Sequence, residues 1–260
     1  MKLSEAFSLL PYLWFALRAA LPPTVSALWA SPSLLWHPHE ISRIFMAKLW
    51  KVLGNGVDTG ARPTKQTLIP DNAHGVVLDL GAGHGHTACY LDPAKVTKYV
   101  AVEPNELMHE EIRALAATKG FTEAAGTLQI LSYGAEDVAL INSALGGPHT
   151  VDTLVSVLTI CSIPEPERTV NALVNDVLKP GGTLLFYEHV LSDRPDVAWW
   201  QRFWTPLWSR VFDGCRLDRP THLWIEKMDV WADKRIWRRE GEQEGQLVGH
   251  RVGRFVKKAE

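Results

Sequence analysis

The stretch Asp79-Leu80-Gly81-Ala82-Gly83-His84-Gly85 completes a short apolar run, residues 76–80, and continues into closely spaced glycines. Such a run is typical of a buried parallel strand. Glycines directly after a strand let the backbone turn sharply and approach a ligand where a Cβ atom would clash. Doubly wound sheets bind ligands in crevices at the carboxyl ends of their strands. The stretch therefore predicts an α/β fold with a binding site at the end of its first strand.

Strand-type runs and helix-type stretches alternate after this loop. The strand-type runs cover residues 99–103, 128–131, 151–158 and 182–190, and the amphipathic helical stretches between them cover 107–118 and 165–178. Two further runs, within 235–239 and 247–257, are predicted to form an antiparallel pair that closes one edge. The pattern predicts a doubly wound, mostly parallel seven-stranded sheet of the Rossmann-like kind.

Composition and charge exclude a disordered, collagen-like or coiled-coil chain and argue against nucleic-acid binding. The 260 residues are 46% hydrophobic and 22% charged, which is ordinary for a globular protein. Lys and Arg total 27 against 29 Asp and Glu, so we expect no nucleic-acid partner. The three cysteines, Cys89, Cys161 and Cys215, lie far apart without a CxxC pair. Their spacing indicates neither a disulfide framework nor a zinc site, so we expect no metal.

Glu103 ends the second strand-type run, about twenty residues after the glycine loop. A carboxylate at that place accepts hydrogen bonds from two ribose hydroxyls. Nicotinamide dinucleotides and S-adenosylmethionine (SAM) both carry such a ribose. His86 stands where the dinucleotide pattern GxGxxG has its third glycine, which disfavours a pyrophosphate site. Gly134-Ala135-Glu136-Asp137, after the third run, places acidic groups where an adenine amino group could donate to them.

The ordered set of these features, together with Leu178-Lys179-Pro180-Gly181-Gly182, resembles the class I SAM-dependent methyltransferases. Phe186-Tyr187-Glu188-His189-Val190, Phe212-Asp213-Gly214-Cys215 and the ending 249–257 resemble more narrowly the methyltransferase-like protein seven family of membrane-associated alkyl-thiol S-methyltransferases. The resemblance covers roughly residues 75–257. It implies a SAM-dependent enzyme that methylates a small, largely apolar acceptor, preferably on thiol sulfur.

The resemblance also implies which residues hold the cofactor. They are Asp79, Gly81, Gly83, Gly85, Glu103, Pro104, Asn105, Ala135, Glu136 and Leu158. Three other functions stay open at this point: an O-methyltransferase of small-molecule or secondary metabolism, a non-catalytic SAM-binding module, and an NAD-dependent reductase.

Three residues are candidates for proton transfer, because a thiol reacts much faster as its thiolate. His189 directly follows the fifth strand-type run, Glu188 is its neighbour, and Asp213 lies in the FDGC turn. Each has a structural alternative, in which it ties down a strand end or caps a turn. Cys161 and Cys215 have no His or Asp at a recognisable spacing, so we expect buried, inert thiols.

Eleven tryptophans lie in two regions, one before residue 51 and one after residue 198. Trp200, Trp204 and Trp208 share one face of a predicted helix that Pro206 kinks or ends. Residues 1–70 contain short apolar pieces punctuated by prolines, an amphipathic helix at 41–53 and a polar stretch at 55–72 that could serve as a linker.

Two roles suit the N-terminal region. We expect residues 1–70 to form a helical lid or a membrane-surface segment, and residues 71–260 to form the catalytic domain. A run of twelve apolar residues at 6–17 is about 18 Å long as a helix, too short for a hydrocarbon core of about 30 Å. The predicted location is the cytoplasm, with peripheral membrane contact through residues 1–36 as the alternative.

Overall fold

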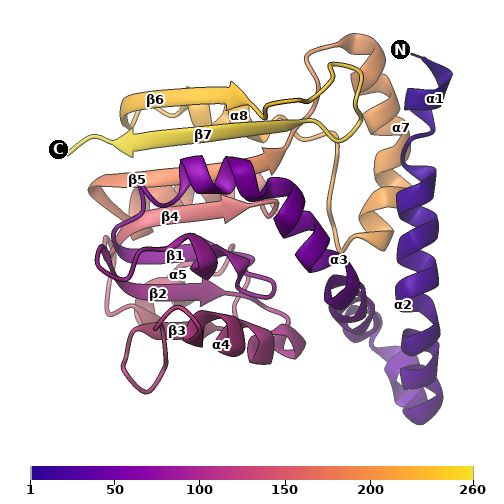
Figure 1. Ribbon diagram of the computed structural model, residues 1–260, viewed down its shortest axis with the longest axis horizontal. Helices are drawn as coiled ribbons and strands as arrows, with labels where there is room; N and C mark the ends of the chain where they lie inside the picture. The colour runs from indigo at the N-terminus through magenta and orange to yellow at the C-terminus, as the bar shows by residue number, and fades with distance from the viewer. Residues whose placement is uncertain (1, 260) are drawn as a thin grey trace.

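The computed structural model describes residues 2–259, and one seven-stranded sheet forms its centre (Figure 1). The strand order is β3-β2-β1-β4-β5-β7-β6. Strands β1 to β5 pair in parallel, and β7 runs antiparallel to both β5 and β6. The predicted mostly parallel sheet with an antiparallel edge is confirmed. The strands are β1 (Gly75–Leu80), β2 (Val96–Val102), β3 (Leu128–Leu131), β4 (Val151–Val157), β5 (Leu178–His189), β6 (Trp231–Arg238) and β7 (His250–Lys257).

Successive residues of β1 enter different cores, because strand side chains alternate between the two faces of a sheet. Leu78 and Leu80 pack into the core that also contains Ile141, Val174 and Ile225. Val77 packs into the opposite core, with side chains from α3 and α4. Both faces of β1 are therefore covered, which explains why its sequence is a continuous apolar run.

The helices and helical turns fall between the strands, apart from a group that precedes them. Their bounds are α1 (Leu3–Ala6), α2 (Leu10–Ala30), η1 (Pro32–Trp36), α3 (Pro38–Leu68), η2 (His86–Tyr90), η3 (Glu106–Met108), α4 (His109–Ala117), α5 (Val138–Ala144), α6 (Pro166–Ala172), η4 (Leu173–Val177), α7 (Pro195–Val211) and α8 (Thr221–Lys227). In Figure 1, α1, α2 and α7 stand beyond the ends of the parallel strands.

A third core joins these outlying helices to α3 and to the loop after β4. Leu9 and Leu13 from the N-terminal region meet Leu49 of α3 and Trp204 and Trp208 of α7. The Trp204 indole Nε1 donates to the Ala6 carbonyl at 2.7 Å, so α1 is tied to α7 by a buried hydrogen bond. The aromatic face of α7 thus buries two of its tryptophans in this core.

Pro22, Pro23 and Pro206 do not end the helices in which they lie. Helix α2 continues through Pro22 and Pro23, and α7 continues five residues beyond Pro206. An interior proline costs a helix about 3 kcal/mol through a lost hydrogen bond and a steric clash. The buried side chains that α2 and α7 contribute to the third core offset that cost. The positions of prolines in the sequence do not reveal this tertiary packing.

The polar stretch 55–72 is not a linker. It forms the second half of α3 and the turn after it. Two of its charged residues, Asp58 and Lys65, pair inside the structure at 2.6 Å, so its polar composition does not mean exposure. The predicted helix at 165–178 is confirmed: α6 is continued by the π-helical turn η4, and β5 begins at Leu178.

Candidate active site

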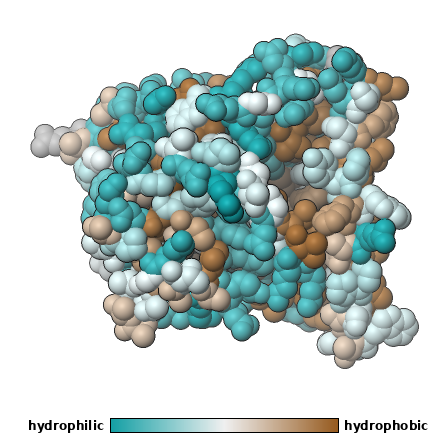
Figure 2. All heavy atoms as spheres, in the orientation of Figure 1, coloured by the Kyte–Doolittle hydropathy of each residue, from teal (hydrophilic) through white to brown (hydrophobic). Residues whose placement is uncertain are grey.

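A cavity of about 740 Å³ lies at the carboxyl ends of the parallel strands. The loops after β1, β2, β3 and β4 and the end of β5 contribute to its lining. Further walls come from α2, α3, α7 with the turn after it, the connection between β6 and β7, and the start of β7. Figure 2 shows apolar residues gathered on the side of the molecule where α1, α2 and α7 lie. The cavity is therefore enclosed by the sheet on one side and by apolar helices on the other.

The glycine loop after β1 is held in a conformation that side chains rarely adopt. Gly81 and Gly83 have φ values of +55° and +57°. A Cβ atom on Gly81 would lie 2.6 Å from Thr159, and one on Gly83 would lie 2.8 Å from Trp50 Nε1. Both glycines line the cavity, so the loop presents bare backbone to whatever the cavity holds.

Glu103 anchors this loop from the end of β2. Its carboxylate accepts from the Gly83 N–H at 2.8 Å and from the Asn105 N–H at 2.9 Å. Burial raises the pKa of Glu103 to about 7 despite these two hydrogen bonds. The side-chain Nδ2 of Asn105 donates to the Arg43 backbone carbonyl of α3 at 2.9 Å. This bond attaches α3 to the loop after β2. Each Glu103 oxygen keeps a lone pair beyond these bonds, and Glu103 lines the cavity.

Glu188 makes the contacts expected of the structural alternative, in which it holds a strand end and the loop beside it. Its carboxylate is fully buried and does not line the cavity. It accepts from the Ser156 hydroxyl at 2.7 Å and from the backbone N–H groups of Thr159, Ile160 and Cys161 at 2.9–3.4 Å. Glu188 thus organises the loop after β4.

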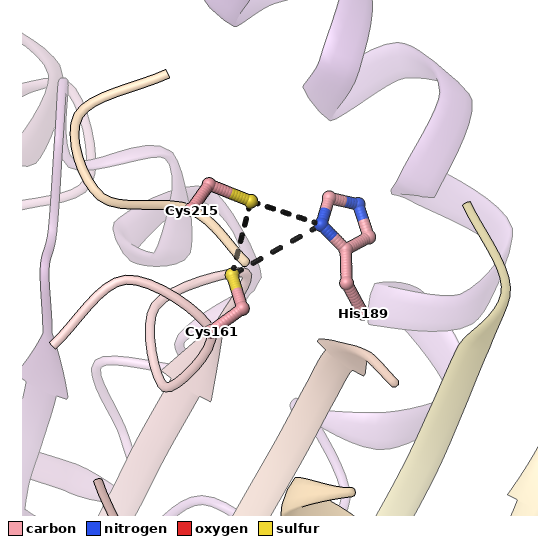
Figure 3. Close-up of side chains that lie close together, drawn as sticks. All are labelled: Cys161, His189 and Cys215. Carbon is pink, nitrogen blue, oxygen red and sulfur yellow. Dashed lines mark hydrogen bonds between the residues drawn. The ribbon is translucent and has the colours of Figure 1, made fainter. Parts of the chain in front are cut away.

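Three side chains that are distant in sequence meet at the cavity wall (Figure 3). We call Cys161, His189 and Cys215 the sulfur–imidazole cluster. Cys215 Sγ lies 3.5 Å from Cys161 Sγ and 3.6 Å from His189 Nδ1, and Cys161 Sγ lies 4.0 Å from His189 Nδ1. Cys215 and His189 line the cavity, and Cys161 lies behind them. The three come from the loop after β4, the end of β5 and the turn after α7.

The cluster is electrostatically uneven. The hydrogen bond with Cys161 lowers the pKa of Cys215 well below that of an ordinary thiol, and the imidazole of His189 lowers it further. The pKa of Cys161 is raised in turn by the same hydrogen bond and by burial. Burial alone would lower the pKa of His189, but the hydrogen bond with Cys215 and the charge of that sulfur raise it. Both thiols are buried, as the sequence predicts, and they share their environment with an imidazole that their positions in the chain do not indicate.

Most of the predicted site residues line this one cavity. They are Gly81, Gly83, Glu103, Pro104, Asn105, Ala135, Glu136, Leu158, His189 and Asp213. Asp79, Gly85 and Glu188 lie behind the lining. Asp79 accepts from the Tyr99 hydroxyl at 2.8 Å, and a Cβ atom on Gly85 would meet the Ile112 backbone at 3.2 Å.

Trp50 and Cys215 are among the lining residues that sequence reasoning did not assign to the site. Trp50 of α3 contacts the glycine loop, and its indole Nε1 is buried without a hydrogen-bond partner. Cys215 was assigned no function. The signal for Trp50 was its place in the amphipathic helix predicted at 41–53, but periodicity does not say which loop a helix faces. Asp213 is strained, with φ +45°, and its carboxylate accepts from the Ser42 hydroxyl of α3.

A family model described as a methyltransferase domain matches residues 57–230. The chain belongs to this methyltransferase domain family. Solved structures agree with the fold of the family. An O-methyltransferase family protein from Burkholderia thailandensis superposes with a TM-score of 0.57 at 12% identity, over 92% of this chain and 71% of that one. The YcgJ protein from Bacillus subtilis gives 0.53 at 16% identity, over 77% and 98%.

Curated relatives of this methyltransferase domain protein carry a more specific name. The rat protein named thiol S-methyltransferase TMT1B is 32% identical over 152 residues, which are 58% of this chain and 58% of the rat protein. The human protein named thiol S-methyltransferase TMT1A is 35% identical over 82 residues, 30% of this chain and 32% of the human protein. The matches thus span about a third to somewhat more than half of these relatives.

Proposed function

We propose that this protein transfers a methyl group from SAM to the sulfur of a small, largely apolar thiol. The observation that carries the proposal is the arrangement of one cavity. The glycine loop, Glu103 and Ala135 lie over β1, β2 and β3, and the sulfur–imidazole cluster lies over β4 and β5. This arrangement gives the cofactor and the thiol separate subsites in one cavity, on either side of the point where the strand order reverses.

The residues on the cofactor side fit SAM. Gly81 and Gly83 turn the loop with positive φ angles and line the cavity with backbone, and Glu103 offers carboxylate oxygens to ribose hydroxyls. The buried, unpartnered Nε1 of Trp50 supplies a hydrogen-bond donor for the methionine carboxylate. Ala135 and Glu136 line the cavity on the same side, where the sequence predicts the adenine.

The protein's contribution is mainly positioning and exclusion of water, because the sulfonium of SAM supplies an activated methyl group. Tyr12 and Phe15 of α2, with Trp50 and Leu53 of α3, wall the cavity on the side away from the sheet. Apolar walls favour an apolar acceptor. The sulfur–imidazole cluster marks where the acceptor sulfur binds, and Glu188 acts on it indirectly by holding the loop that carries Cys161.

Calorimetric binding of SAM followed by methyl transfer to matched alkyl-thiol and phenol acceptors tests the proposal. We expect SAM binding and turnover of the thiol, with little or none of the phenol. Turnover of the phenol alone would move the assignment to O-methylation. The Glu103→Gln variant is the control for the cofactor subsite. It replaces one accepting oxygen with an NH₂ group, and we expect SAM affinity to fall about tenfold, the usual cost of a lost hydrogen bond to a charged group.

We also infer that residues 1–36 contact a membrane surface. Trp14, Trp29 and Trp36 are 68%, 80% and 85% exposed, and Leu35 beside them is 65% exposed. Aromatic side chains held in water at this density are typical of a surface that lies in the headgroup region of a bilayer. None of the helices within residues 2–259 is both long and apolar enough to cross a membrane.

A further inference from the structure

The sulfur–imidazole cluster has the ligand types and the open side of a catalytic zinc site. Two thiolates and one imidazole are a set that catalytic zinc uses, with the fourth position left to water or substrate. A tetrahedral ion with bonds of about 2.3 Å to sulfur and about 2.0 Å to nitrogen places its sulfurs about 3.8 Å apart and each sulfur about 3.6 Å from the nitrogen. The three ligand atoms are 3.5, 3.6 and 4.0 Å apart.

Hydrogen bonds to the backbone carbonyl of Cys161, rather than a contact between the sulfurs, hold the two cysteine loops together. The Arg216 N–H donates to the Cys161 carbonyl at 3.0 Å, and the Arg219 guanidinium donates to the same carbonyl at 2.8 Å. Gly214, with φ +85°, lets the turn approach so closely that a Cβ atom there would lie 2.9 Å from the Ser162 carbonyl. The spacing of the ligands is thus set before any ion binds, which lowers the cost of ordering them.

A second layer of contacts orients the ligands. The Trp208 indole Nε1 donates to Cys215 Sγ at 3.3 Å, and Glu188 accepts from the Cys161 N–H at 3.4 Å. Such outer contacts hold metal ligands in place in known sites. Cys161 closes the back of the cluster, and His189 and Cys215 face the cavity, so the fourth position would open toward the acceptor subsite.

We propose that Cys161, His189 Nδ1 and Cys215 bind a divalent ion of the zinc type, and that the acceptor thiol completes its coordination as a thiolate. This inference rests on the proposed function. On binding, the acceptor gives its proton to bulk water, since a metal ligates the deprotonated sulfur. The sulfur then donates an electron pair to the methyl carbon, and the carbon–sulfonium bond breaks with its pair moving to the sulfur of S-adenosylhomocysteine.

The charges in this step balance. A thiolate and a sulfonium give two neutral thioethers, and a neutral thioether is a weak ligand, so the product would leave the ion. The assignment replaces the role of proton acceptor that the sequence predicts for His189. It also revises the expectation of no metal site, because ligands from three loops show no spacing pattern in the chain.

Metal analysis of the full, reduced chain tests the site directly. We expect one zinc per chain to remain after gel filtration, and cobalt(II) to give the intense visible bands of a tetrahedral site with thiolate charge-transfer bands. The Cys161→Ser and Cys215→Ser variants should each weaken metal binding by more than the about 100-fold that outer contacts cost. Cys89→Ser is the matched control, since Cys89 lies in η2 outside the cluster, and it should bind metal normally.

Two further measurements keep the test independent of folding and of the proposed function. Trp208→Phe retains all three ligands and should weaken metal binding about 10- to 100-fold. Adding an alkanethiol to the cobalt protein should shift its visible spectrum, and an equal amount of the matching alcohol should not.

The outcomes separate the two proposals. Reduced wild-type protein that takes up no zinc, or that forms a Cys161–Cys215 disulfide in its place, overturns the metal inference. So does full thiol turnover by metal-free enzyme that still binds SAM, a result that leaves the proposed function standing. Zinc binding in a protein without affinity for SAM would overturn the proposed function and the acceptor role of the ion together.

Discussion

At the scale of single residues, the buried carboxyl of Asp79 makes the stability of the folded protein depend on pH. Its carboxyl is buried behind the glycine loop and accepts from the Tyr99 hydroxyl. Burial raises its pKa to about 6 from 3.8. The folded protein therefore keeps this proton to a higher pH than the unfolded chain does. The stability that Asp79 contributes is complete below pH 4 and is lost as the pH rises through 6.

The Asp79→Asn variant removes this titration. We expect its free energy of unfolding, relative to wild type, to rise by about 3 kcal/mol between pH 4 and pH 7, which is the value of a shift of about two units. Urea denaturation at the two pH values measures the difference. Asp71→Asn, at an exposed position after α3, is the matched control. An equal pH dependence in both variants would contradict the assignment to Asp79.

At the scale of elements, α3 is the part that connects the N-terminal helices with the catalytic fold. Its C-terminal half carries Lys65, whose Nζ donates to Asp58 at 2.6 Å, and the Tyr90 hydroxyl of η2 donates to the same carboxylate at 2.9 and 3.0 Å. The side chains of Lys65 and Asp58 are 5% and 9% exposed. The Lys65–Asp58 pair holds the C-terminal half of α3 in place. The polar sequence of this half suggested a linker.

Lys65→Met should destabilise the protein by about 3–5 kcal/mol, because it removes the buried cation that contacts the Asp58 carboxylate at 2.6 Å and leaves only the exposed Arg62 guanidinium, at 3.9 Å, to pair with it. Arg168→Met is the control for a charge removed at the surface, since the Arg168–Glu165 pair is 83% and 67% exposed, and we expect a cost below about 1 kcal/mol. Thermal or urea unfolding of both variants gives the comparison. Similar losses of unfolding free energy in the two variants would show that the buried Lys65–Asp58 pair contributes no more to stability than a surface pair.

At the scale of the whole molecule, the exposed tryptophans of α2 and η1 lie on the N-terminal helices, away from the cores of the sheet. Replacing Trp29 and Trp36 together with Ser should reduce binding to phosphatidylcholine–phosphatidylserine vesicles at least about tenfold, because each ring contributes about 1.5–3 kcal/mol when it leaves water. Sedimentation with the vesicles measures the bound fraction. Trp199→Ser, at a 56% exposed position on α7, is the control. An equal loss in the control, or no binding of wild type, would contradict membrane contact through residues 1–36.

Much of the fold could be predicted, and so could the part of the cavity lining that the glycine loop and Glu103 contribute. The strand β1, the glycine loop and Glu103 are close in sequence, and their pattern of apolar runs and glycines reflects local backbone requirements. The division between residues 1–70 and 71–260 stays a prediction. Trp50, which contacts the glycine loop from α3, shows that both parts build the same cavity.

The sequence by itself determined that this chain forms a doubly wound sheet with a glycine loop after its first strand, because apolar strand runs and glycine φ angles are local properties. Long-range packing decided the rest. It carried α2 and α7 through their prolines, buried the Lys65–Asp58 pair, and placed Cys161, His189 and Cys215 within 4.8 Å of one another. Those three residues meet because the parallel strands β4 and β5 end at the same edge of the sheet and a close turn at Gly214 brings in the third, and no spacing along the chain records that meeting.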